Sequence, residues 1–434
     1  MERDDAWNRL FERMPISEGI SKDGIFFVSA AEMKAHGGRE PRLMAKIDTL
    51  AERPAALAEN GLAIFPVRNG RYALFPDPAG KSFHRFAESD LPAVRPFRSA
   101  IDLDRFDTFP HGRVASESQA LDFAYLSSLL PAFCGDPGMR LTLRGRLFSG
   151  DFGFRTPVDG IPVGVSRVQI EVDAGYEGDE GIYLVEAKQG RRDDFHIRQL
   201  WYPYLNWAAR TRKRVVPIFF AYSNGQYFLT EFAFGGEFGE LSVVKTKAYC
   251  LEEPRARLDF PAMLRAVPMG EEPLGAFPQA NDLDKVVDTV LAAQTESGGE
   301  SGTAGITKAE IAARFDMDER QGDYYGNAGN YLGLLRRREG VFEPTESGLV
   351  FAALRSRSAR TATLARRMLE IPSLRRAVEL LVAREFRVEK ILTAELAAVI
   401  RDNTSLSAST PGRRASTVKS WLTWIMRNVD IRVS

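Results

Sequence analysis

The stretch QIEVDAGYEGDEGIYLVEAKQG, residues 169–190, decides the fold, because it has the pattern of two strands joined by a tight turn. Its first half alternates apolar and polar side chains: Val168, Ile170 and Val172 against Gln169, Glu171 and Asp173. Strand side chains point alternately to opposite faces, so this strand has one apolar face and one face that carries both acids. The glycines within residues 178–181 indicate the turn, and GIYLVEAK forms the returning strand.

The spacing of this hairpin brings charged side chains together. In a hairpin, positions equidistant from the turn face each other, and Asp173 and Glu186 are centred between Asp179 and Glu180. Lys188 shares the face of Glu186 because strand side chains repeat every two residues. The sequence therefore predicts two carboxylates and one ammonium group on the same face of a sheet.

Two neighbouring carboxylates repel each other and raise a pKa unless a positive charge lies between them. Mg²⁺ is a suitable cation, because it takes oxygen ligands and leaves positions open for water and for phosphate oxygens. Such a site serves phosphodiester hydrolysis, in which Lys188 holds or deprotonates the attacking water and stabilises the transition state. Glu171 lies on the same face as Asp173 and is a further possible ligand. An ordinary cross-strand ion pair on a solvated face is the alternative.

The neighbouring segments indicate an α/β fold. Residues 1–105 contain the strand-like pieces GLAIFPV and RYALFP around an RNG turn, and a helix is expected from Ser116 to Leu130. RLTLRGRLFSG, residues 140–150, reads as a strand. DDFHIRQLWYPYLNWAAR, residues 193–210, reads as a helix that carries His196 and an aromatic set expected in the core, and Asn224-Gly225 as a hairpin turn. The expected order of the core is helix, three strands, helix, strand.

Composition limits the classes of protein. The 434 residues are 44% hydrophobic and 27% charged, which is ordinary for a soluble globular chain, and no apolar run is long enough to span a membrane. The first residues do not resemble a secretory signal. Two distant cysteines, Cys134 and Cys250, suit the reducing cytoplasm and argue against a zinc site. The net charge is zero, but from Gly305 onward 22 basic residues outnumber 15 acidic ones, which indicates a basic module.

The C-terminal third has the element order of a winged helix over residues 278–355. A helix with an apolar stripe, Leu283 to Leu291, precedes a capping box, Thr307 to Glu310, and a third helix is expected from about Glu319 to Arg337, followed by VFEPTESG as a wing. The third helix would enter the major groove of DNA. Its side chains that suit contacts to bases or phosphates are Arg320, Gln321, Tyr324, Asn327 and Asn330. A small dimerisation or packing module is the alternative, and residues 356–434 form a further helical segment with a possible second such unit.

Several of these stretches together resemble a known superfamily. Asp173 followed by Glu186-Ala187-Lys188, in the order helix, three strands, helix, strand, resembles the PD-(D/E)XK nucleases. SESQALDFAYLSSLL (116–130), LVEAKQGRRDDFHIRQLWYPY (184–204) and FFAYSNGQYFLTEFAF (219–234) look like a family of bacterial type II restriction endonucleases, with Val172 in place of the proline of the motif name. The resemblance implies a nuclease core over residues 106–270 with an N-terminal α/β domain.

The resemblance also assigns roles. It implies that Asp173, Glu186 and the Ala187 carbonyl bind Mg²⁺, that Lys188 is catalytic, and that Glu117 and Gln199 assist. It further implies a cytoplasmic enzyme that cuts double-stranded DNA as a homodimer, with a cognate DNA methyltransferase as its genetic partner. In the N-terminal segment, Arg39 and Arg42 compete with the C-terminal helix for the role of reading bases. Two other functions stay open: a DNA-binding regulator on an inactive nuclease scaffold, and a nuclease for RNA, junctions or modified DNA.

Overall fold

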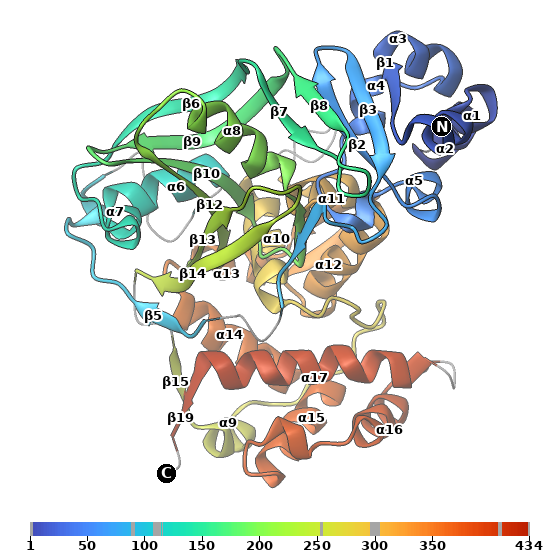
Figure 1. The fold of residues 1–434 in the computed structure, drawn as a ribbon. Helices are drawn as coiled ribbons and strands as arrows, with labels where there is room; N and C mark the ends of the chain where they lie inside the picture. The colour runs from blue at the N-terminus through green and yellow to red at the C-terminus, as the bar shows by residue number, and fades with distance from the viewer. Residues whose placement is uncertain are drawn as a thin grey trace. The chain divides into compact units, whose positions relative to one another are not determined.

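The computed structural model describes residues 3–87, 92–106, 114, 116–251, 255–295, 304–406 and 410–432. It is a mixed α/β protein, as expected, and has two compact units (Figure 1). The first comprises residues 1–93, 128–221 and 228–248, and the second comprises residues 94–127, 222–227 and 249–434. None of the helices in the described ranges combines the length and the apolar character that a membrane span requires.

The N-terminal part of the first unit is a small sheet with short helices. Both strands expected around the RNG turn are present, β2 (Leu62–Arg68) and β3 (Arg71–Pro76), and β1 (Phe26–Ser29) completes the antiparallel order β1-β3-β2. Trp7 and Leu10 are fully buried in the core of this part. The helices are α1 (Arg3–Arg13), α2 (Ile16–Asp23), α3 (Ala30–Glu32), a π-helix (Met33–Gly37), α4 (Pro41–Ala45), a 3₁₀-helix (Leu50–Glu52) and α5 (Ala55–Glu59).

The principal sheet of the first unit carries residues 169–190. Its strand order within this unit is β14-β13-β12-β10-β9-β6, and α8 (Arg198–Ala208) packs against β9 and β10 (Figure 1). The strands are β6 (Arg140–Phe148), β9 (Gln169–Glu177), β10 (Gly181–Gln189), β12 (Arg214–Ser223), β13 (Gln226–Phe234) and β14 (Leu241–Cys250). Two antiparallel pairs and one helix accompany the sheet: β4 (Phe83–Arg85) with β11 (Asp194–His196), β7 (Phe152–Arg155) with β8 (Pro162–Val165), and α7 (Leu129–Cys134).

Three expectations for this region were wrong in detail. The single helix expected from Ser116 to Leu130 is two helices, α6 (Glu117–Leu126) and α7, because Ser128 has a left-handed φ of 66° that ends the first one. The β7–β8 hairpin lies between β6 and β9 and had not been expected. His196 is on strand β11 and not on a helix, and it is buried between the rings of Phe65 and Phe83. The aromatic residues Trp201 and Tyr202 are core residues, as expected.

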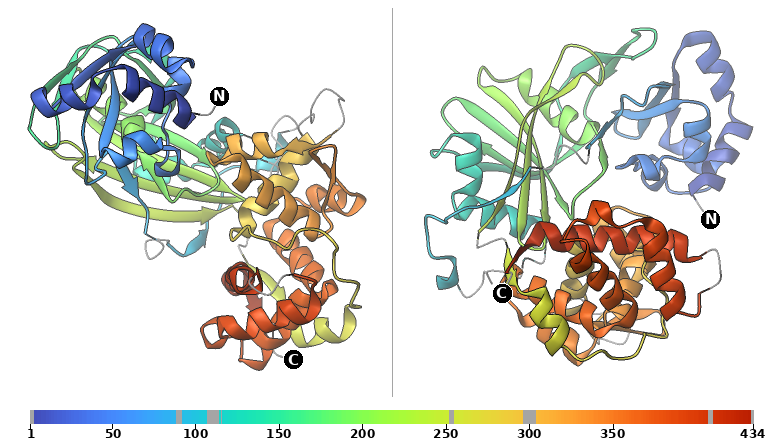
Figure 2. Two further views of the ribbon diagram at one scale, coloured as in Figure 1. Left: turned by 90° about the vertical axis from the view of Figure 1, so that its right-hand side faces the viewer. Right: turned by 90° about the horizontal axis from the view of Figure 1, so that it is seen from below.

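The second unit is mainly helical. A parallel pair, β15 (Ala256–Leu258) and β19 (Val429–Ile431), joins its ends, and α17 (Thr410–Asn428) packs along α15 and α16 (Figure 2). The other elements are β5 (Val94–Pro96), a 3₁₀-helix (Leu103–Arg105), α6, α9 (Phe260–Ala266), α10 (Leu283–Thr295), β16 (Ile306–Thr307), α11 (Lys308–Phe315), α12 (Glu319–Tyr331), β17 (Leu335–Arg338), β18 (Val341–Pro344), α13 (Glu346–Ala353), α14 (Arg357–Glu370), α15 (Pro372–Ala383), a 3₁₀-helix (Val388–Lys390) and α16 (Thr393–Asn403).

The segment from α10 to β18 has the expected order of three helices and a hairpin. Only residues 341–344 of the expected wing VFEPTESG are a strand, because Thr345 caps helix α13. The capping box is confirmed, because Thr307 and Glu310 exchange both hydrogen bonds at the start of α11. The third helix was expected to reach Arg337 but ends at Tyr331, since Gly333 takes a left-handed φ of 70°. The three arginines that follow therefore lie on β17, which pairs with β18.

Glycines fix the buried face of α12. A Cβ atom at Gly322 would lie 2.2 Å from the Lys308 carbonyl oxygen, and one at Gly326 would lie 2.2 Å from the Phe342 ring. These close approaches place one face of α12 directly against α11 and β18. Arg320, Tyr324 and Asn327 recur at i, i+4 and i+7, so they share a different, partly exposed face of the same helix.

A buried polar network holds the hairpin tip 222–227 in the second unit. Asn224 and Gly225 form the expected turn, with φ of 43° and 79°. The Asn224 side chain also donates to Asp284 (2.9 Å) and accepts from Arg360 (2.9 Å), so the residue is more than a turn, which was all the sequence had suggested. Asp288 accepts from Ser223 Oγ (2.6 Å) and from the Asn224 N–H (2.9 Å).

Asp288 makes the stability of the second unit pH-dependent. Burial raises the pKa of Asp288 to about 7, and the nearby Asp284 charge adds to the effect. Because the folded pKa lies above the unfolded value, its stabilising contribution is complete below about pH 4 and is lost as the pH rises through 7. Asp288→Asn should therefore gain stability relative to the parent chain between pH 5 and 8, by up to about 4 kcal/mol.

Thermal melts at several pH values measure this gain. Asp402→Asn, which makes the same substitution at an exposed acid on α16, is the matched control. A constant difference between Asp288→Asn and the parent chain from pH 5 to 8 would contradict the assignment.

Candidate active site

The β9–β10 hairpin places the two acids opposite each other, as predicted. The register pairs Leu184 with Gly175 and Val185 with Ala174, so the next pair along the ladder is Glu186 with Asp173. The turn closes through a hydrogen bond from the Gly178 N–H to the Gly181 carbonyl (3.0 Å). The predicted register of the hairpin is therefore confirmed.

Three of the predicted side chains, on β10 and α8, are joined through Glu186 Oε1, and Asp173 lies opposite Glu186 on β9. Glu186 Oε1 accepts from Gln199 Nε2 (2.7 Å) and lies 2.9 Å from Lys188 Nζ. Asp173 Oδ2 accepts from the Ala187 N–H (2.7 Å). The side chains of Glu186 and Lys188 are 10% and 12% exposed, so this pair is nearly buried. We call Asp173, Glu186, Lys188 and Gln199 the carboxylate cluster.

Burial dominates the electrostatics of the carboxylate cluster. It raises the pKa of Glu186 to about 8, with Lys188 opposing the rise and the Asp173 charge adding to it. Burial also raises the pKa of Asp173, against the opposing effects of the Ala187 N–H and Lys188. The chain therefore holds two acids where their ionised forms are disfavoured, and a cation at this place would stabilise those forms.

Asp48 is a further acid that the sequence did not reveal. It is 8% exposed, and its negative charge contributes to the raised pKa of Glu186. Its carbonyl accepts from the His196 N–H (2.8 Å), which ties the segment after α4 to strand β11. Asp48 stands next to Thr49 in the stretch REPRLMAKIDT, residues 39–49, whose basic residues Arg39 and Arg42 carried the prediction for this segment.

Two predicted residues lie apart from the hydrogen bonds of the cluster. Glu171 is exposed and pairs with Arg146 on the neighbouring strand β6 (3.3 Å), although its charge still raises the pKa of Asp173. Glu117 is the first residue of α6, half-buried, and belongs to the second unit. Its assisting role stays a prediction, as does a ligand role for Glu171 or for the Ala187 carbonyl.

The residues predicted to contact DNA have these places. On α12, Arg320 is exposed and donates to Tyr324 Oη (2.6 Å), and Asn327 donates to Asp323 (2.8 Å). The other two predicted residues of α12 are Gln321, which is exposed, and Asn330, which is half-buried. In the first unit, Arg39 is half-buried just before α4, and Arg42 is exposed on that helix.

The donors of the carboxylate cluster fit a hard divalent cation with few protein ligands. Among the described residues, no group of three or more His, Cys, Asp and Glu side chains is arranged to hold a metal. The cluster offers two carboxylates, and Mg²⁺ is commonly held by one or two, with water and substrate oxygens as the other ligands. Gln199 Oε1 is buried without a hydrogen-bond partner in the described part of the chain, so this acceptor is available to a bound water.

Comparison with known proteins divides the chain into three matched segments. Residues 4–74 match a domain of unknown function (DUF6996), residues 79–250 a second (DUF6997) and residues 301–430 a third (DUF7226). Comparison with the curated proteins and with the solved structures gave no match. The whole carboxylate cluster lies within the middle segment, and Asp48 lies within the first.

Proposed function

We propose that this protein is a Mg²⁺-dependent, site-specific endonuclease that hydrolyses phosphodiester bonds in double-stranded DNA, as a type II restriction enzyme does. The observation that carries the proposal is the carboxylate cluster itself. Two acids face each other on β9 and β10, and Glu186 Oε1 lies within 3 Å of both Lys188 on β10 and Gln199 on α8. The element order from α6 to β12 contains helix, three strands, helix and strand, with α7, the β7–β8 hairpin and β11 in addition, and this order also supports the PD-(D/E)XK resemblance.

Asp173 and Glu186 would hold the metal, with the Ala187 carbonyl as a possible further ligand. When bound, Mg²⁺ supplies positive charge to the phosphate and lowers the pKa of a bound water. The raised pKa values of both acids support this assignment, because burial outweighs the charge of Lys188 and a bound divalent cation would add the positive charge that two ionised acids need.

The chain's own groups position and stabilise the reacting atoms. The Ala187 N–H fixes Asp173, and Gln199 Nε2 fixes Glu186, so neither carboxylate needs to reorient. Lys188 Nζ lies beside Glu186, where it can hold the attacking water or donate to a phosphate oxygen as negative charge develops. These roles require no acidic side chain other than Asp173 and Glu186.

DNA binding is assigned to two regions. The α12 face of Arg320, Tyr324 and Asn327 carries side-chain types that bind base edges and phosphates. The hairpin β17–β18 follows it and presents three exposed arginines, residues 336–338. Cleavage of both strands by a homodimer, and a cognate methyltransferase that protects the host DNA, belong to the same proposal.

Metal removal is the direct test. Incubation of unmethylated plasmid and phage DNA with the pure protein and Mg²⁺ should yield discrete fragments. EDTA should slow cleavage at least about 10³-fold, since the metal contributes several kcal/mol to transition-state stabilisation, and added Mg²⁺ should restore it. Mapped fragment ends then give the recognition sequence.

Other outcomes select the other functions. DNA that stays intact but is retarded on a gel would favour a regulator on an inactive nuclease scaffold. Smeared products, or cleavage of RNA, junctions or modified DNA alone, would support phosphodiester hydrolysis but contradict site-specific cleavage of double-stranded DNA.

A further inference from the structure

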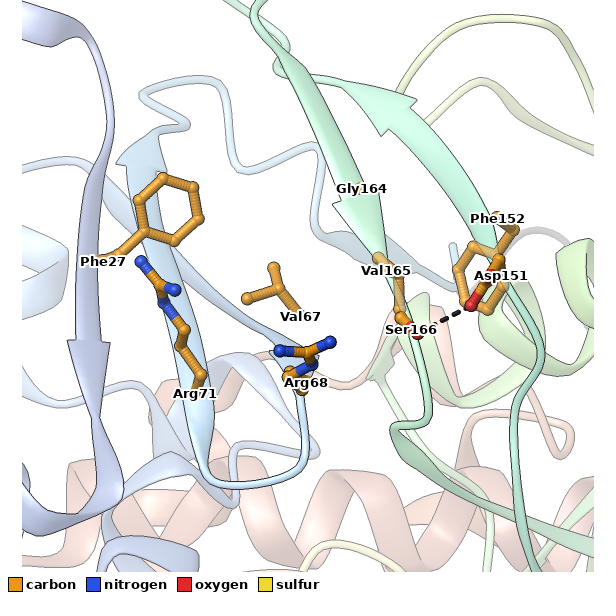
Figure 3. Close-up of a pocket in the computed structure, with 9 residues that line it drawn as sticks. All are labelled: Phe27, Val67, Arg68, Arg71, Asp151, Phe152, Gly164, Val165 and Ser166. Carbon is orange, nitrogen blue, oxygen red and sulfur yellow. Dashed lines mark hydrogen bonds between the residues drawn. The ribbon is translucent and has the colours of Figure 1, made fainter.

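A hollow of about 430 Å³ lies in the first unit between the β2–β3 hairpin and the β7–β8 hairpin (Figure 3). Arg68, Arg71 and Phe27 line one wall, and Asp151, Phe152 and Ser166 line the other. Its volume is within the range of ligand-binding clefts. None of these residues belongs to the carboxylate cluster or to the regions already assigned to DNA.

The two arginines face each other across the turn of one hairpin. Arg68 and Arg71 are directly paired in the β2–β3 register, and both are exposed. No acidic side chain in the described ranges lies within ion-pairing distance of either one. Glu32 acts on Arg71 only at longer range, because its carboxylate is held by the Ser29 N–H and hydroxyl, both at 2.7 Å. Two like charges are thus held together without a compensating anion.

The aromatic rings define the shape of the hollow around these charges. The Arg71 guanidinium lies 4.9 Å from the centre of the Phe27 ring, which orients its donors, and Phe27 is 41% exposed. Phe152 stands on the opposite wall (Figure 3). The combination of two arginines from adjacent strands with one exposed and one half-buried aromatic ring suits a nucleotide, whose phosphate takes bidentate arginine contacts and whose sugar and base pack on apolar surface.

The opposite wall restricts where the anion can bind. Asp151 is exposed and accepts a hydrogen bond from the Ser166 hydroxyl (2.6 Å). Its negative charge repels a phosphate from the β7–β8 side, so the phosphate oxygens are directed to the arginines. The same carboxylate can accept from an amino group of a base.

We propose that this hollow binds one nucleotide of the DNA, with Arg68 and Arg71 on a backbone phosphate. The inference rests on the proposal that the chain acts on DNA, and it assigns the β2–β3 hairpin of the N-terminal segment to substrate binding. The sequence had assigned the DNA contact of this segment to Arg39 and Arg42, at and just before α4. The proposal assigns a DNA contact to the β2–β3 hairpin.

The test is DNA binding by the double variant Arg68→Ala/Arg71→Ala. A Lys188→Met chain with Mg²⁺ would be titrated against a fluorescent duplex by anisotropy, with and without the double substitution, over a range of salt concentrations. Loss of the phosphate contact should weaken binding about 10- to 100-fold and reduce the salt slope by about 1. Arg13→Ala/Arg140→Ala is the matched control, because both arginines are exposed in the same unit and hydrogen-bond to backbone carbonyls outside the hollow.

The outcomes separate this inference from the proposed function. If both double variants lost the same affinity for DNA, the effect would come from net charge alone, and the proposed nucleotide site would be wrong. An unchanged affinity in Arg68→Ala/Arg71→Ala would overturn it as well. If only Arg68→Ala/Arg71→Ala lost DNA binding, but the parent chain cut no DNA, the nucleotide site would be supported and the nuclease function would be rejected. Absence of any duplex binding by the parent chain would reject both.

Discussion

Lys188→Met should reduce the rate of DNA cleavage by about 10² to 10⁴-fold, the range over which a positioned acid–base or charge-stabilising group acts. The ammonium group of Lys188 lies 2.9 Å from Glu186 Oε1 and its side chain is 12% exposed, so it is held at the carboxylate cluster and keeps a small exposed surface. Single-turnover cleavage of plasmid DNA measures the rate, and gel retardation of the same duplex measures binding. The loss should fall on the rate while the affinity for DNA stays within about threefold, because the lost interaction belongs to the transition state.

Lys213→Met is the matched control for that experiment. Lys213 Nζ pairs with Glu177 Oε1 at 2.5 Å at the other end of β9, so it is also a lysine–glutamate pair in the first unit. It is more exposed, at 34%, and is remote from Asp173 along the strand. If Lys188 and Glu186 formed only an ordinary ion pair along one face of β10, the two variants would cut equally well, and the catalytic assignment would fail.

The core of the carboxylate cluster was predictable because its determinants are local. The register of Asp173 with Glu186 depends only on the turn between them, and the alternation of side chains fixes the face of Lys188. Gln199 came from the family resemblance, and the structure places it within 2.7 Å of Glu186. Thirteen residues separate this pair in sequence, a distance over which the order strand, strand, helix constrains the geometry.

Asp48 could not be predicted, because its place depends on a long-range contact. It is more than 130 residues from Glu186 in sequence, and strand pairing between β11 and β4 and the hydrogen bond from His196 bring the two segments together. The prediction for Asn224 was incomplete for the same reason. Its turn is a local signal, but its hydrogen-bond partners Asp284, Arg357 and Arg360 are distant in sequence. Periodicity within a segment carries no information about either contact.

The ends of helices were also predicted poorly from the sequence, and here the cause is the local backbone conformation. The run RRR at 336–338 continues a helical pattern, yet the left-handed φ of Gly333 had already ended α12. Ser128 takes the same conformation without a glycine to signal it, so the break between α6 and α7 left no trace in the sequence. The DNA-contact set was affected little, because its five members on α12 precede Tyr331.

Arg357→Met should destabilise the second unit by about 3 to 5 kcal/mol. The Arg357 side chain is fully buried and pairs with Asp284 Oδ1 at 2.9 Å. It also donates to the Asn224 carbonyl (2.6 Å) and to Asn428 Oδ1 (2.8 Å). Replacement by methionine keeps the volume but leaves the Asp284 carboxylate, 4% exposed, without its cation. Equilibrium unfolding in urea or guanidinium chloride measures the loss.

The loss should come from the unpaired charge and not from the missing volume, and two further variants separate these causes. Arg357→Met/Asp284→Asn removes both charges and should recover a large part of the stability, because a neutral amide is far less costly to bury than an unpaired carboxylate. Arg366→Met breaks an exposed pair with Glu370 on the same helix α14 and should cost less than about 1 kcal/mol. If the double variant were no more stable than Arg357→Met, the hydrogen bonds to Asn224 and Asn428 would carry the energy, and the ion pair would be secondary.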